Sequence, residues 1–160
     1  MNYIELDNYS RKWIFTHASM PVAETDLAQI KPLTQARSAQ IWREFISSQS
    51  ADADHFEQGD WAFDKNIWSE AKDWQTAWDE DENENILPDG LLDSIQWEDN
   101  TTVFFCYEKY NVIETKWSVF KRNWKNFLFF DDGPMLIGRK QEQVLWFKSN
   151  GTYLQGLRAK

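Results

Sequence analysis

The clearest pattern of apolar and polar positions lies in the segment from residue 117 to 134. Its apolar residues are spaced i, i+3, i+7, i+10 and i+11, which predicts an amphipathic helix lying on a core. These positions are Trp117, Phe120, Trp124, Phe127 and Leu128. The segment then continues through two phenylalanines into Asp-Asp-Gly-Pro, and a proline cannot continue a helix. We therefore expect this helix to end near Phe129 or Phe130.

The rest of the C-terminal sixty residues has the pattern of β-strands. The predicted strands are residues 101–107, 112–115, 135–138, 144–147 and 152–157. The first of them is apolar on both faces, which is typical of a strand inside a sheet. Asn150 and Gly151 indicate a hairpin before the last strand. The order strand, strand, helix, strand, strand, strand predicts an antiparallel sheet with a helix on one face, an α+β fold.

The N-terminal half has weaker, mostly helical patterns. Helices are predicted at residues 24–30, 35–47 and 66–78, with Thr34 as the cap of the second, and a short strand at 12–16. Residues 91–97 predict a short helix or an irregular apolar turn, and the polar stretch 47–60 a loop. We expect a single domain, 1–160, with a helical, tryptophan-rich part at 1–97 packed on a sheet with one helix at 98–160.

The composition adds an excess of aromatic residues. The chain has ten tryptophans and eleven phenylalanines among 160 residues, which argues against disorder and favours an aromatic core. Four tryptophans fall close together, at Trp61, Trp68, Trp74 and Trp78. A core role is the simpler interpretation of these four residues, and an aromatic binding platform is the alternative.

Charge is distributed unevenly along the chain. The net charge is −9, and residues 51–100 hold sixteen acids and two bases, whereas residues 101–160 hold five acids and ten bases. The acidic middle, including the run 79–85, repels phosphates, so we expect no nucleic-acid binding. The opposite face of the 117–134 helix carries Lys121, Arg122 and Lys125. This face has three possible roles: an anion or partner site, an internal partner for the acidic middle, or a solvated surface.

Few residues are candidates for catalysis. Asp131 and Asp132 are adjacent carboxylates that suit metal binding or acid–base chemistry, although a turn favours the same residues. His17 and His55 are the only histidines, and we expect surface or structural roles for both. The single cysteine, Cys106, excludes an internal disulfide and falls in an apolar strand. We find no phosphate-binding loop or nucleophile motif, and we expect no metal and no cofactor.

Three segments carry a resemblance to a known family. They are WSVFKRNWKNFLFFDDGP at 117–134, KWIFTHAS at 12–19 and NGTY at 150–153. With them the chain resembles, over its full length, a small family of uncharacterised bacterial proteins known as a domain of unknown function. The resemblance implies a cytoplasmic bacterial protein and no particular activity, cofactor or site residue. A weaker analogy is to acidic α+β immunity proteins.

These observations favour a non-catalytic protein-binding module. The reasons are the acidic charge, the surplus of aromatic residues and the lack of a catalytic motif. Behaviour like that of an immunity protein or inhibitor is a subtype of this hypothesis. The alternative is a small-molecule-binding protein or hydrolase that uses Asp131, Asp132 and His17. No apolar run is long enough for a signal peptide or membrane span, so we expect a soluble cytoplasmic protein whose oligomeric state stays open.

Overall fold

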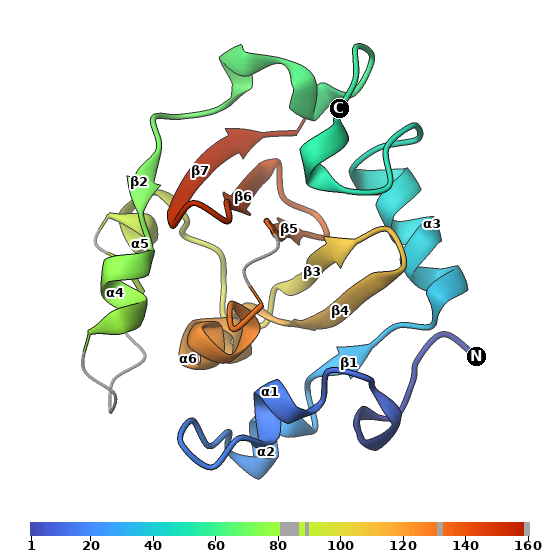
Figure 1. Cartoon of the computed structure of the whole chain (residues 1–160), viewed down its shortest axis with the longest axis vertical. Helices are drawn as coiled ribbons and strands as arrows, with labels where there is room; N and C mark the ends of the chain where they lie inside the picture. Colours follow the sequence, from blue (N-terminus) through green and yellow to red (C-terminus); the bar gives the residue numbers. More distant parts are fainter. Residues whose placement is uncertain (81–86, 89, 131–132, 159–160) are drawn as a thin grey trace.

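The fold is α+β and is built around a seven-stranded antiparallel sheet (Figure 1). A computed structural model describes residues 1–80, 87–88, 90–130 and 133–158 of the chain. The strands are β1 (Lys31–Pro32), β2 (Lys72–Asp73), β3 (Thr102–Glu108), β4 (Asn111–Lys116), β5 (Met135–Gly138), β6 (Gln143–Phe147) and β7 (Thr152–Leu157). They follow one another in the sheet as β1-β4-β3-β5-β6-β7-β2.

The five long strands come from the C-terminal part of the chain, as predicted. Each predicted strand is present, and its bounds differ from the prediction by no more than one residue. The two edge strands were not predicted. β1 pairs with β4 and β2 pairs with β7, so two segments of the N-terminal half complete the sheet. Each is only two residues long, which is too short for an alternating pattern to show.

Helices cover both faces of this sheet. The α-helices are α1 (Trp13–Thr16), α2 (Glu24–Leu27), α3 (Gln35–Phe45), α4 (Gln75–Asp79), α5 (Leu91–Ser94) and α6 (Trp117–Phe127). Four 3₁₀ turns are η1 (Leu6–Asn8), η2 (Ala53–His55), η3 (Trp61–Phe63) and η4 (Lys65–Ile67). None of the helices in the described part of the chain is long and apolar enough to cross a membrane.

Alternate residues of the strands face two separate cores. In β3, Phe105 belongs to the core under α6, whereas Phe104 and Cys106 belong to the core under α3. Figure 1 shows α6 and α3 on opposite sides of the β3–β4 hairpin. The apolar character of both faces of β3, visible in the sequence, therefore reflects a sheet that is covered on both sides.

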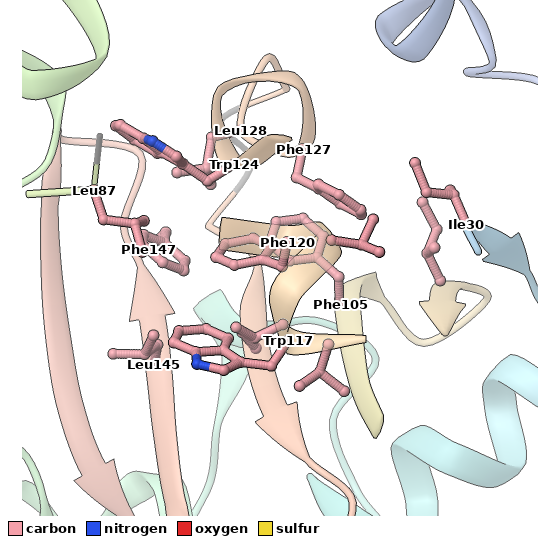
Figure 2. Packing of buried hydrophobic residues seen from close by; sticks show 14 of the residues in the cluster. Ile30, Leu87, Phe105, Trp117, Phe120, Trp124, Phe127, Leu128, Leu145 and Phe147 are labelled. Carbon is pink, nitrogen blue, oxygen red and sulfur yellow. The ribbon is translucent and has the colours of Figure 1, made fainter. Parts of the chain in front are cut away.

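The helix α6 contributes its apolar stripe to the first core. Its predicted apolar positions are all buried, and Figure 2 shows them packed against the side chains of Phe105, Leu145 and Phe147 of the sheet. The helix ends at Phe127, two residues before the nearer predicted end, with Leu128 as its C-cap. The aspartates that follow, Asp131 and Asp132, lie outside the described residues.

The helix predicted at 35–47 is confirmed as α3, which ends two residues earlier, at Phe45. Its N-cap is Thr34, whose Oγ1 accepts a hydrogen bond from the backbone N–H of Arg37 at 3.2 Å. Such a cap satisfies one of the N–H groups that a helix start leaves without a partner. The predicted helix at 24–30 is shorter, ending at Leu27.

The predicted strand at residues 12–16 is wrong, because α1 occupies this segment. Ile14 and Phe15 are both buried, and α1 packs against α6 rather than against a sheet edge. A short apolar run cannot distinguish a buried strand from a single buried helical turn. The contact with α6, which lies a hundred residues away in sequence, decides the conformation.

The predicted helix at residues 66–78 is also wrong. This segment contains η4, the edge strand β2 and the short helix α4. Two of its backbone donors bind the C-terminal hairpin: Ser69 N–H donates to the carbonyl of Gln155 in β7, and Trp74 N–H to that of Gly151 just before β7. The chain thus passes around the edge of the sheet, and its tryptophans separate onto the two faces.

Candidate binding site

The four tryptophans at 61, 68, 74 and 78 do not form one platform. Trp74 is buried in the core under α6, and Trp78 packs beside that core at its margin. Trp61 and Trp68 are partly buried on the other face, where their ring centroids are 5.9 Å apart. The four tryptophans therefore lie in two different environments, and of the four only Trp68 lines the hollow described next.

This hollow, which we call the aromatic hollow, has a volume of about 400 Å³. It lies between the segment that contains η2, η3 and η4 and the end of the β6–β7 hairpin. Its lining consists of Ala53, Asp54, Phe56, Ala62, Phe63, Lys65, Trp68, Ser69, Trp146, Lys148 and Leu154. Pockets of this size hold a small molecule or one or two side chains of a partner.

Hydrogen bonds to the backbone fix both indoles of the hollow. Trp68 Nε1–H donates to the carbonyl of Ala62 at 2.9 Å, and Trp146 Nε1–H donates to that of Gly133 at 3.2 Å. Their polar edges are thereby satisfied within the chain, while the rings remain part of the lining. Both rings are partly exposed, so the hollow presents apolar surface whose orientation is already set.

Contacts between rings hold the walls of the hollow together. The centroid of Trp146 is 5.2 Å from that of Trp68 and 5.7 Å from that of Phe56, the second pair in an edge-to-face arrangement. Aromatic pairs at these separations contribute about 0.5–1.5 kcal/mol each beyond their burial. The rings therefore belong to one connected cluster from three segments of the chain.

A glycine in β7 allows Trp68 to approach the strand. A Cβ atom on Gly156 would lie 2.6 Å from Cε3 of Trp68 and 3.1 Å from the carbonyl oxygen of Ile67. We expect Gly156→Ala to lower the free energy of unfolding by about 1–3 kcal/mol, because the ring has to move away from the strand. Urea unfolding measures this cost, and the indole N–H resonance of Trp68 reports the displacement.

A double-mutant cycle provides the control for this prediction. In a Trp68→Leu background the six-membered ring is gone, so the added methyl group meets less resistance and Gly156→Ala should cost clearly less. An equal cost in both backgrounds would show that the close approach of Trp68 is not what requires glycine at this position.

The hollow also has charged groups. Lys65 comes from η4, and Lys148 follows β6 with its Nζ 4.9 Å from the ring centroid of Trp146. Asp54 is the single acid among the described residues of the lining. Beside it, His55 Nδ1 lies 2.5 Å from Asp52 Oδ1, and the hydrogen bond and charge of that carboxylate raise the pKa of His55 above its ordinary value. The His55 ring itself is exposed and lies outside the lining.

The predicted basic face of α6 is largely engaged within the chain. Lys121 Nζ lies 2.8 Å from Asp99 Oδ1, and Lys125 is buried, with its Nζ donating to the backbone carbonyl of Glu80 at 2.8 Å. Asp99 and Glu80 both belong to the acidic middle of the sequence. Lys125 therefore does not lie on an outer face, contrary to the helical spacing, because α4 covers that side of α6.

The third basic residue, Arg122, pairs with a buried acid. Its Nη2 and Nε donate to the two carboxylate oxygens of Asp26 at 2.7 and 3.0 Å. Asn123 adds a third hydrogen bond, from its Nδ2 to Asp26 Oδ2 at 2.9 Å, and also donates to the carbonyl of Val119. The backbone angles of Asn123 are not helical, so the helix is interrupted at this residue. Its side-chain hydrogen bonds to Val119 and Asp26 compensate for the interruption and connect α6 to α2.

Of the three catalytic candidates, His17 is the one that lies within the described residues. His17 is exposed, and its Nδ1 lies 2.5 Å from Ser19 Oγ two residues later. Asp131 and Asp132 lie outside the described residues, so their use with His17 stays a prediction. Burial raises the pKa of the Cys106 thiol, which suits a core residue. Within residues 1–80, 87–88, 90–130 and 133–158, no three His, Cys, Asp or Glu side chains are grouped so that they could hold a metal ion.

Comparison with known proteins places this structure in a family. The sequence model of the family described as "Protein of unknown function (DUF2947)" matches residues 3–156. The chain belongs to the DUF2947 family. No curated protein and no solved structure matches it significantly. The match extends over all seven strands except the end of β7, so the aromatic hollow lies entirely within the DUF2947 region.

Most residues of the hollow in this DUF2947 chain were not identified from the sequence. Of the predicted aromatic platform, only Trp68 lines it. Trp146 and Lys148 lie about eighty residues further along the chain and had been interpreted only as parts of a strand and a turn. No local pattern connects them with Trp68, because their proximity results from the pairing of Trp68 with Gly156 at the edge of the sheet.

Proposed function

We propose that this protein is a non-catalytic binding protein that recognises another protein by accepting one of its side chains in the aromatic hollow. The observation that carries the proposal is the pair of partly exposed indoles, Trp68 and Trp146, each fixed by a hydrogen bond to the backbone of another segment. Binding to rigid aromatic rings costs little conformational entropy, since their orientation is set before the partner arrives.

Known features of protein interfaces support this interpretation. Tryptophan is among the residues that contribute most to binding, typically near the centre of an interface and surrounded by contacts that exclude water. In the hollow, Phe63 extends the apolar surface outward from the indoles, and the residue is 53% exposed. A partner covering the hollow and this rim would bury the ring together with the indoles.

The biological setting of the proposal follows the sequence expectations. We propose a cytoplasmic bacterial protein, with immunity-like or inhibitory action as one form that binding takes. The acidic run at 79–85 would be part of such an inhibitor surface, and residues 81–85 lie outside the described residues.

The test uses one exposed ring inside the hollow and one outside it. Tagged wild-type protein is incubated with native lysate, and the proteins it retains are quantified by mass spectrometry. We expect one stoichiometric partner, which Phe63→Ala retains at least about fivefold less because an interface ring contributes more than about 1 kcal/mol. Tyr110→Ala removes an equally exposed ring from the β3–β4 turn and should retain the partner like wild type.

Two results contradict the proposal. One is the absence of a stoichiometric protein partner under all conditions, and the other is a partner that Phe63→Ala and wild type retain equally. A small molecule is the second candidate ligand, since the volume of about 400 Å³ lies within the range of small-molecule sites. Native mass spectrometry of the purified protein would reveal it as an added mass that Phe63→Ala reduces.

A further inference from the structure

We infer that the aromatic hollow selects an acidic segment of its partner, with one aromatic or aliphatic side chain as the anchor and carboxylates beside it. The inference rests on the proposed function and names the chemistry of the partner. It is carried by two lysines at the hollow, Lys65 and Lys148, and by the way the edge of the sheet is closed next to them.

The two lysines are a local exception in an acidic region. Residues 51–100 hold sixteen acids and two bases, and Lys65 is one of those two bases. Within the described residues, neither Lys65 nor Lys148 forms an ion pair. By contrast, the cations of α6 are bound by Asp99, Asp26 and the carbonyl of Glu80. The hollow thus keeps two ammonium groups available for a ligand.

The acids near the hollow offset the positive charge of Lys65 and Lys148 only in part. The carboxylate of Asp54 lies next to Gly133. Its Oδ1 is 4.0 Å from the position that a Cβ atom on Gly133 would occupy. The carboxylate of Asp52 is engaged within its own turn, where its Oδ1 lies 2.5 Å from His55 Nδ1 and accepts from the backbone N–H of Asp54. Among the described residues, the lining therefore has two cations and one acid, and the partner's carboxylates belong beside the lysines.

The net charge of −9 does not cancel this local preference. At physiological ionic strength the Debye length is about 8 Å, so charges further away than this are largely screened. A ligand carboxylate in contact with Lys65 or Lys148 interacts mainly with those ammonium groups. The distant acids reduce the rate of encounter more than the stability of the contact.

The partner segment has to bind through its side chains, because the adjacent strand edge is already paired. Trp68 bridges to Gly156, Ser69 N–H donates to the carbonyl of Gln155, and β2 pairs with the start of β7. The backbone of β7 beside the hollow is thus unavailable for an added strand. An anchor side chain between the indoles, with carboxylates reaching the lysines, uses the groups that remain.

The test is a titration of ¹⁵N-labelled protein with three synthetic peptides, followed by the indole N–H resonances of Trp68 and Trp146. The peptides are acetyl-EEFEE-amide, acetyl-KKFKK-amide and acetyl-EEAEE-amide, which separate the contribution of the ring from that of the charge. We expect the first peptide to shift both resonances and to bind at least about tenfold more tightly than either of the others.

Charge variants of the protein complete the design. The double variant Lys65→Glu with Lys148→Glu should bind acetyl-EEFEE-amide at least about tenfold more weakly and acetyl-KKFKK-amide more tightly. Lys140→Glu makes the same change in the turn at the other end of β6 and should alter the affinity by less than about twofold. Circular dichroism confirms that the variants are folded.

The outcomes separate the inference from the proposed function. Equal or tighter binding of acetyl-KKFKK-amide to wild type would overturn the acidic partner while leaving the hollow as a binding site. Binding of acetyl-EEAEE-amide as tight as that of acetyl-EEFEE-amide would overturn the apolar anchor. If no peptide shifts the indole N–H resonances at millimolar concentration, the inference is wrong. The proposed function is then still tested separately, by whether wild type retains a partner from lysate that Phe63→Ala does not retain.

Discussion

Replacing Phe120 by alanine should lower the free energy of unfolding by about 3–5 kcal/mol, a large part of the 5–15 kcal/mol that typically stabilises a protein. Phe120 is fully buried in the centre of α6. Its ring centroid lies 5.6 Å from that of Phe105 in β3 and 6.0 Å from that of Phe147 in β6, so it connects the helix to two strands (Figure 2). Removing it leaves a cavity that these rigid rings cannot close.

Urea unfolding measured by circular dichroism gives the cost of this substitution. Tyr110→Ala removes an exposed ring from the β3–β4 turn and should change the free energy of unfolding by no more than about 0.5 kcal/mol. A loss below about 1 kcal/mol for Phe120→Ala would contradict the packing of α6 on the sheet.

Arg122→Ala should destabilise the protein by about 3 kcal/mol, and Asp26→Ala by less, about 1–2 kcal/mol. The asymmetry arises because the side chain of Asp26 is 7% exposed and that of Arg122 is 59% exposed. Without Arg122 a buried carboxylate keeps only Asn123 as its hydrogen-bond donor, whereas without Asp26 the guanidinium can be hydrated. The double variant should therefore resemble Asp26→Ala.

The same pair predicts how stability changes with pH. The hydrogen bonds from Arg122 hold the pKa of Asp26 below its ordinary value, so the folded protein binds this proton less tightly than the unfolded chain. Its stabilising contribution is complete above the unfolded pKa of about 3.9 and is lost as the pH falls through the lower folded value. The difference in stability between wild type and Asp26→Ala should shrink below about pH 4.

Unfolding in urea at pH 7 and at pH 3 tests both statements. The penalty of Arg122→Ala should also decrease in acid, because the buried carboxyl group of Asp26 can then be neutral. Equal effects of the two single variants at pH 7, or a difference between wild type and Asp26→Ala that grows in acid, would contradict the buried ion pair.

The sequence predicted the C-terminal part of the fold well because the relevant signals are local. The apolar stripe of α6 lies within a dozen consecutive residues, and β3, β5 and β6 each contain a continuous apolar run. The α+β class follows from their order. The two failures, at 12–16 and 66–78, are short segments whose conformation depends on distant partners: α6 in the first case, and β7 in the second.

The binding site was predictable only in part. Trp68 was proposed as a member of an aromatic platform together with Trp61, Trp74 and Trp78, yet Trp74 and Trp78 lie on the other side of the sheet. Helical spacing places Trp68, Trp74 and Trp78 on one face, whereas the extended chain around the sheet edge separates Trp68 from the other two. The aromatic excess indicated that rings dominate this protein, without distinguishing the buried ones from those that line the aromatic hollow.

By itself, then, the sequence determined the helix at 117–127, the five long strands and the class of the fold, because hydrophobic periodicity acts over a few neighbouring residues. The tertiary structure decided the two edge strands, the burial of Lys125, the pairing of Arg122 with Asp26 and the aromatic hollow. Each of these features needs contacts between residues far apart in the chain. Such contacts form only when the strands have paired, so no local pattern records them.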